Sequence, residues 1–247
     1  MIVQACLNGA RAPGFHPRLP VTTEAIAGDA AEAIAAGAAE LHIHVRGPAG
    51  AESLEPDAVD ATLAAVRQRL PGTLIGISTG EWIEKDDDRR LGLISRWREL
   101  PDYASVNLGE MGAPAVVEAL HRRGVGIEAG LAIAADAERL IELGLSGLSL
   151  RILIEIDQQP LGEAMAEADA ILAVLARAGL RKPLLLHGSD ATVWPFVERA
   201  AREGFSTRVG LEDGDALPDG ETAPDNAALV AGAVEIMRNG LIGRRAK

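Results

Sequence analysis

Short apolar runs alternate with longer amphipathic segments along the whole chain. Eight times in succession, a run typical of a strand is followed by a segment whose apolar residues recur at helical spacing. In the first such segment, Thr22 or Thr23 is expected to cap a helix, Ile26 and Ala30 lie on its apolar stripe, and Gly37 ends it. Strands are expected at 2–6, 41–45, 73–78, 103–109, 125–130, 148–156, 183–188 and 207–212, and helices at 22–39, 56–69, 88–99, 113–122, 133–143, 161–178, 192–203 and 225–238.

Eight βα units in 247 residues predict an α/β fold, a closed (β/α)8 TIM barrel that forms one domain over residues 1–247. Right-handed crossovers would place every helix outside the barrel. A doubly wound open sheet is the alternative. It usually carries a G-x-G-x-x-G turn after its first strand, and "CLNGARAPG" at 6–14 does not match that pattern.

Composition narrows the class of protein. With 48% hydrophobic but only 3% aromatic residues, the core is expected to consist of small aliphatic side chains. No apolar run approaches the roughly 18 residues of a membrane span, and the first residues lack the order of a signal peptide, so a cytoplasmic protein without a membrane partner is expected. The net charge of −12 argues against a nucleic-acid partner. With Cys6 as the single cysteine, metal ligands would have to be His, Asp or Glu.

The second predicted strand carries three polar residues on one face. Leu41, Ile43 and Val45 would face the helices, which sends His42, His44 and Arg46 into the barrel. Two imidazoles at this spacing near the end of a strand can bind one metal ion. The alternative is that each histidine is a hydrogen-bonded core residue.

The last predicted strand supplies a third candidate ligand. Alternation along "TRVGLEDG" places Arg208 and Glu212 inside the barrel, and Asp213 begins the following loop. Two histidines and a glutamate form a typical zinc site whose fourth position is open to a substrate oxygen. Alternatively, Glu212 and Asp213 are a solvated loop start or a helix cap.

Further polar groups lie at the ends of other strands, where a barrel has its active site. Ser78, Thr79 and Gly80 form a turn that could hold a carboxylate or phosphate. Asn107 ends the fourth strand and Glu128 lies on the fifth. His187, at the end of the seventh, is either a proton shuttle or a capped ring.

Several motifs, in this order, resemble the landmarks of the β-keto acid cleavage enzymes. They are "CLNGARAPGFHPRLPVTTEAIA", "HIHVR", "STG", "YASVNLGEM", "RVGLED" and "DNAALV", and they extend from about residue 5 to about residue 235. The resemblance implies a zinc-binding (β/α)8 barrel that assembles as a homo-oligomer, a tetramer or a dimer. It also implies a reaction in which a β-keto acid and acetyl-CoA become a new CoA ester and acetoacetate.

The resemblance also implies roles for individual residues. It assigns zinc to His42, His44 and Glu212, proton abstraction to Asp213, support of that aspartate to Arg208, and substrate binding to Ser78. Thr79, Gly80, Asn107, Glu128 and Arg46 are the further substrate-binding candidates.

The chain also departs from the family pattern. Gly47-Pro48 stands where the family has Asp-Pro, Glu81 replaces a second glycine, and the glycine-rich segment near the sixth strand is absent. Two other functions therefore stay open. One is different zinc chemistry in a barrel, either hydrolysis or a retro-Claisen or aldol reaction without CoA. The other is a non-catalytic barrel that binds a metal or acyl-CoA.

Overall fold

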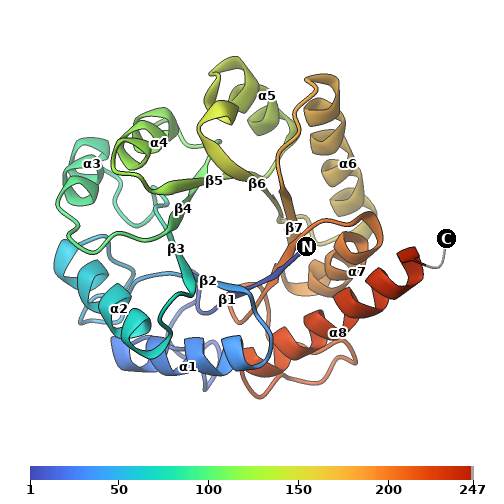
Figure 1. Cartoon of the computed structure of the whole chain (residues 1–247), viewed down its shortest axis with the longest axis horizontal. Coiled ribbons are helices and arrows are strands. Elements are labelled where there is room, and N and C mark those ends of the chain that lie inside the picture. Colours follow the sequence, from blue (N-terminus) through green and yellow to red (C-terminus); the bar gives the residue numbers. More distant parts are fainter. Residues whose placement is uncertain (246–247) are drawn as a thin grey trace.

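The computed structural model, which describes the backbone of residues 1–245, is a barrel of parallel strands surrounded by helices (Figure 1). Its strands are β1 (Val3–Cys6), β2 (Glu40–Ile43), β3 (Leu74–Ser78), β4 (Tyr103–Asn107), β5 (Gly126–Leu131), β6 (Ser149–Ile156), β7 (Leu184–Gly188) and β8 (Thr207–Val209). Its helices are α1 (Thr23–Ala35), α2 (Pro56–Arg69), α3 (Asp87–Ser95), α4 (Ala113–Arg122), α5 (Ala134–Glu142), α6 (Leu161–Arg177), α7 (Val193–Glu203) and α8 (Asn226–Arg245). The predicted (β/α)8 TIM barrel is confirmed.

The strands follow one another around the barrel in chain order, and β1 lies between β2 and β8. The ring closes between β7 and the residue that precedes β8. The backbone N–H of Leu186 donates to the Ser206 carbonyl at 2.9 Å, and the N–H of Ser206 donates to the Leu184 carbonyl at 3.0 Å. Because all eight strands are parallel, their carboxyl ends meet at one end of the barrel.

The third helix is shorter than predicted. The pattern predicted a helix over 88–99, but α3 ends at Ser95. Asp60 on α2 explains the difference, because its Oδ1 accepts hydrogen bonds from the backbone N–H groups of Arg98 and Glu99, both at 2.9 Å. These amide groups are therefore unavailable for another turn of helix.

Three strands also end earlier than predicted, and all three carry site residues. The fourth was predicted over 103–109 but ends at Asn107. The second was predicted over 41–45 but ends at Ile43, because the Asn8 side chain binds the backbone of the next residue, His44. Asn8 Oδ1 accepts from the His44 N–H at 3.0 Å, and Asn8 Nδ2 donates to the His44 carbonyl at 2.9 Å. The eighth was predicted over 207–212 but ends at Val209. There the Gly210 carbonyl accepts from the Asp213 N–H at 2.9 Å and closes a turn.

The lower part of the barrel interior, toward the amino ends of the strands, is polar rather than aliphatic. Arg151 donates through Nε to Glu128 Oε1 at 2.5 Å and through Nη2 to Glu40. Gln4 donates to Glu40 at 2.9 Å and to the Tyr103 hydroxyl at 2.9 Å. The apolar core instead lies between the strands and the helices, so the upper interior is left to the residues described next.

Candidate metal centre and active site

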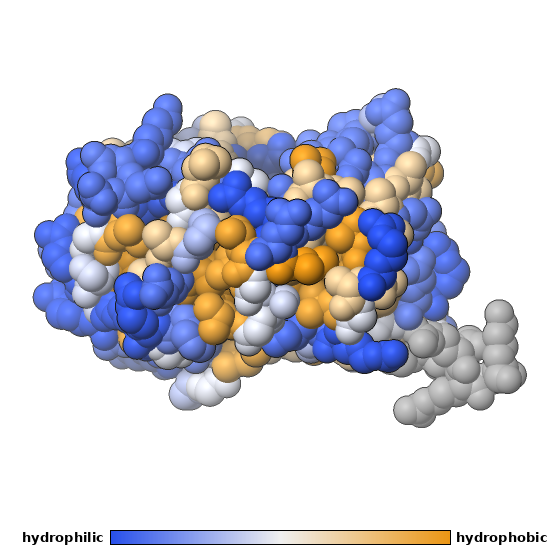
Figure 2. Space-filling model, turned by 90° about the horizontal axis from the view of Figure 1, so that it is seen from above, coloured by the Kyte–Doolittle hydropathy of each residue, from blue (hydrophilic) through white to orange (hydrophobic). Residues whose placement is uncertain are grey.

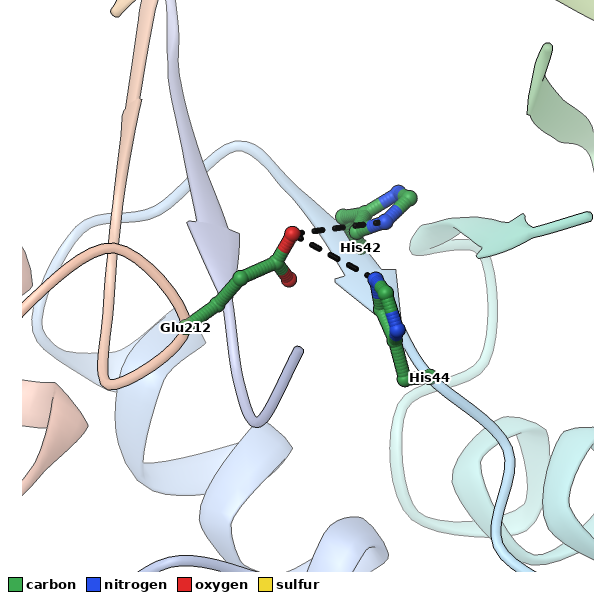
Figure 3. Close-up of side chains that lie close together, drawn as sticks. All are labelled: His42, His44 and Glu212. Atoms are coloured by element: carbon green, nitrogen blue, oxygen red, sulfur yellow. Dashed lines mark ion pairs between the residues drawn. The ribbon is translucent and has the colours of Figure 1, made fainter. Parts of the chain in front are cut away.

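His42 and His44 lie side by side at the carboxyl end of β2 and face the barrel interior (Figure 3). Their ring centroids are 5.2 Å apart, and both residues are buried. The two residues share a side because alternate residues of an extended chain point the same way, and this geometry continues past the end of β2. The hydrogen bonds of Asn8 to the His44 backbone fix the second histidine there.

Glu212 approaches the two histidines from the turn that follows β8 (Figure 3). Its Oε1 is 3.4 Å from His44 Nε2 and 3.9 Å from His42 Nε2. Asn226, at the start of α8, positions this turn because its Oδ1 accepts from the Leu211 N–H at 2.7 Å. Gly210 lets the turn lie directly against β1, since a Cβ there would lie 1.9 Å from the Cys6 carbonyl oxygen.

The three side chains fit a zinc ion. One nitrogen or oxygen atom from each of them lies within 4.8 Å of the others. Two ligand atoms at about 2.0–2.1 Å from a tetrahedral zinc ion are about 3.4 Å apart, which is close to the separations that Glu212 makes with the histidines. Among the described residues, the buried atoms His42 Nδ1 and Glu212 Oε2 have no hydrogen-bond partner. The chemistry and spacing of the donors therefore match a metal site.

A metal ion needs neutral histidines and an ionised glutamate as ligands, and the surroundings favour these states for His42 and Glu212 but not for His44. Burial lowers the pKa of His42 to about 3, which keeps its imidazole neutral. Burial alone would raise the pKa of Glu212, but Arg208 and the two histidines hold it well below its usual value. Burial also acts to lower the pKa of His44, but Glu212 and Glu52 raise it to about 9. A metal ion would therefore have to displace a proton from His44.

Asp213 lies in a buried cluster of charged groups beside these ligands. Its Oδ1 is 3.3 Å from His187 Nδ1 and 3.5 Å from Arg208 Nη2. His187 Nε2 in turn lies 3.3 Å from Glu155 Oε2, to which Arg208 Nη2 donates at 2.7 Å. Burial and Arg208 act to lower the pKa of His187, but the two carboxylates outweigh them and raise it to about 9. The cluster holds one oxygen of Asp213, while Oδ2 has no partner among the described residues.

A cavity of about 340 Å³ joins these groups at the mouth of the barrel. Its wall includes seven of the eleven residues predicted from the sequence: His42, His44, Ser78, Asn107, Arg208, Glu212 and Asp213. Within the described part of the chain, the one hydrogen bond to Ser78 Oγ is a long one, 3.4 Å from the Gly80 N–H, so the hydroxyl proton of Ser78 is available to a ligand.

The other four predicted residues do not line this cavity. Thr79 donates its hydroxyl to the Ser105 carbonyl at 2.8 Å, and Gly80 lies beneath the ring of Trp82. Arg46 donates to the backbone carbonyls of Gly9, Arg11 and Gly50, so it supports the loop after β1. Glu128 lies in the polar network of the lower barrel. Substrate contact by these four residues stays a prediction.

Sequence reasoning missed several residues of the cavity wall, including Arg11, Trp82 and Glu155. Glu155 had a usable signal, because alternation from Arg151 on β6 places it inside the barrel at the carboxyl end of the strand. Arg11 and Trp82 lie in loops, where no periodicity indicates which side chains turn inward.

Solved structures similar to this chain share its fold. The apo structure of ObcA has a TM-score of 0.71 at 18% identity over 93% of this chain and 63% of that one. The structure of 3-dehydroquinate dehydratase from Geobacillus kaustophilus has a TM-score of 0.65 at 10% identity over 100% and 92% of the two chains. At such identities the likeness supports the barrel fold alone. Separately, none of the described helices is both long enough and apolar enough to cross a bilayer.

Curated relatives match a shorter segment. A 3-keto-5-aminohexanoate cleavage enzyme of Fusobacterium nucleatum is 34% identical over 37% of this chain and 34% of its own length. A protein of the same name from Acetoanaerobium sticklandii is 30% identical over 44% and 39%, and a 3-oxoadipate:acetyl-CoA acetyltransferase of Cupriavidus necator is 31% identical over 40% and 34%. The matched segments thus cover little more than a third of each relative.

A family model decides the classification, because it extends over nearly the whole chain. The model of the beta-keto acid cleavage enzymes matches residues 1–244, a range that contains every strand of the barrel and all the residues of the candidate metal centre. This chain belongs to the β-keto acid cleavage enzyme family.

Proposed function

We propose that this protein is a zinc-dependent enzyme that converts a β-keto acid and acetyl-CoA into a new CoA ester and acetoacetate. The proposal rests on one observation: three side chains that fit a zinc ion line the same cavity as the buried Asp213. Asp213 is only 3% exposed and lies next in the chain to the ligand Glu212. Family membership and the names of the curated relatives support this reaction class.

His42, His44 and Glu212 would hold the ion. Bound there, zinc would polarise the keto group of the substrate and stabilise negative charge on it. Ser78 and Asn107, on the opposite wall of the cavity from β8, would bind and orient the substrate carboxylate through their hydrogen-bond donors.

Asp213 acts as the base. Arg208 and His187 hold its Oδ1, which leaves Oδ2 to accept the α-proton of the β-keto acid. The resulting carbanion attacks the thioester carbonyl of acetyl-CoA and expels the CoA thiolate. The thiolate then attacks the original keto carbonyl. Cleavage of the adjoining C–C bond releases the new CoA ester and acetoacetate, whose carbanion takes back the proton from Asp213.

We also propose that the protein is a homo-oligomer, a tetramer or a dimer. Figure 2, which looks onto the side of the molecule that carries α5, shows apolar side chains gathered in the middle of that face. Among the exposed hydrophobic residues of this part of the chain are Ile133, Leu143, Leu150 and Leu161, each at least 44% exposed. Light scattering on a sizing column would give the mass of the assembly, and a monomer would contradict the proposal.

The reaction is tested with purified protein, acetyl-CoA and a panel of β-keto acids. We expect about one zinc ion per chain and the appearance of acetoacetate with at least one member of the panel. Asp213→Asn should keep the zinc and lose about 100- to 10,000-fold in turnover, the range for removal of a general base. Asp219→Asn, an exposed change farther along the same connection between β8 and α8, is the matched control.

Other outcomes separate the rival functions. Consumption of a keto acid without acetyl-CoA would identify a CoA-independent lyase. Zinc binding without any turnover would indicate a non-catalytic barrel. An Asp213→Asn variant with full activity would remove Asp213 from the role of base.

A further inference from the structure

A small hairpin follows β2 and turns the chain back onto His44. The Gly47 N–H donates to the Ala51 carbonyl at 2.8 Å, and the Ser53 N–H donates to the Val45 carbonyl at 2.9 Å. The first of these hydrogen bonds closes the turn "GPAG", residues 47–50, the stretch in which the chain departs from the family's Asp-Pro. This short turn places Glu52 directly beside the second histidine.

Glu52 contacts the nitrogen of His44 that faces away from the candidate metal position. Its Oε1 lies 2.5 Å from Nδ1, whereas Nε2 faces Glu212 Oε1 at 3.4 Å. A carboxylate can only accept, so Nδ1 must carry the proton in this contact, and a neutral ring then presents Nε2 as the ligand atom. His42 has no such support, because its Nδ1 is without a partner among the described residues.

Trp82 holds Glu52 in this position. The indole Nε1 donates to the two carboxylate oxygens at 3.0 and 3.3 Å, and the ring stacks on His44 with centroids 6.3 Å apart and planes 23° apart. Gly80 makes room for the indole, since a Cβ there would lie 2.3 Å from the ring. The sequence "STGEW" thus brings the tryptophan over the metal site.

We propose that Glu52, held by Trp82, is a positioning residue that fixes the tautomer and ring orientation of His44 and thereby sets the zinc affinity of the site. The inference rests on the proposed zinc site. It identifies a carboxylate–histidine–metal arrangement, in which the carboxylate also makes the ligating nitrogen more basic. The arrangement needs two acceptors on one side chain, one for the imidazole and one for the indole.

Glu52→Gln tests this requirement, because an amide has one acceptor atom for two donors. We expect zinc affinity, measured by competition with a chelator, to fall by about 10- to 100-fold. Trp82→Phe keeps a stacked ring without the N–H and should lower affinity by less. Glu55→Gln is the matched control, since Glu55 belongs to the same loop but points to Arg89 at the surface, and its affinity should equal that of the wild type.

A second measurement separates positioning from general loss of structure. Nitrogen-15 NMR of the metal-free protein, recorded at a pH above 9 so that the His44 ring is neutral, should show the proton of His44 on Nδ1 in the wild type and mixed tautomers in Glu52→Gln. The thermal midpoint of the metal-free protein should stay within a few degrees. Unchanged zinc affinity and an unchanged tautomer in Glu52→Gln would overturn the inference and leave the proposed function intact. A wild-type protein that binds no zinc would overturn the proposed metal site together with this inference.

Discussion

Asn226 offers a quantitative test of how the turn after β8 is held. The side chain is fully buried and makes three hydrogen bonds: Oδ1 accepts from the Leu211 N–H at 2.7 Å, and Nδ2 donates to the Leu7 carbonyl at 2.8 Å and to Asp29 Oδ2 at 2.6 Å. Asn226→Ala leaves these partners without a hydrogen bond in a dry environment. At about 1–2 kcal/mol for each of the three hydrogen bonds, the free energy of unfolding should fall by about 3–6 kcal/mol.

This loss should be measured by urea unfolding in the presence of a chelator, because bound zinc would itself stabilise the native state. The midpoint should shift without a change in slope, and the zinc affinity of the folded variant should fall by about tenfold or more as the turn bearing Glu212 relaxes. Asn239→Ala, an exposed change on the same helix, is the control. A loss below 1 kcal/mol with unchanged zinc affinity would refute the idea that Asn226 holds the turn.

Two further substitutions test groups close to this turn. Burial raises the pKa of Asp29 from 3.8 to about 7, so its contribution to stability is full below about pH 4 and is lost as the pH rises through 7. Asp29→Asn should therefore stabilise the protein at pH 8, on the order of 4 kcal/mol, and change its stability little at pH 4. Urea unfolding at the two pH values would check this, and equal effects at both would contradict the pKa shift. Gly210→Ala forces a methyl group to within 1.9 Å of the Cys6 carbonyl oxygen and should cost about 3 kcal/mol or more, together with zinc binding. Gly92→Ala is the control for Gly210→Ala, because a methyl group at position 92 meets nothing within 4 Å, and it should leave the thermal midpoint unchanged or raise it. Similar midpoints for the two alanine variants would show that β1 and β8 separate easily.

The sequence predicted the barrel well because each βα unit carries its own local pattern. Alternation of apolar residues distinguishes strands from helices over stretches of 5 to about 18 residues without any knowledge of the rest of the chain. The errors fell at the ends of elements. Asp60 ends α3 and Asn8 ends β2 through side-chain hydrogen bonds that come from 36 to 39 residues away in the chain.

Part of the candidate site could be predicted for the same reason. His42, Arg208 and Glu155 belong to strands, so alternation gives their direction. Glu212 was predicted to face inward as a strand residue and reaches the histidines from a turn instead. The prediction placed it near them because the turn is short and directly follows β8.

Only the tertiary structure decided which groups surround these side chains. Glu52, Trp82 and Asn226 support the site from loops and a helix start, and their partners lie between 8 and 219 residues away in the chain. Arg46 shows the converse, since alternation predicted that it faces the barrel interior but could not predict that its guanidinium binds loop carbonyls. The physical reason is that alternation is a property of the local backbone, whereas a loop conformation follows from hydrogen bonds and packing that form only when the barrel closes.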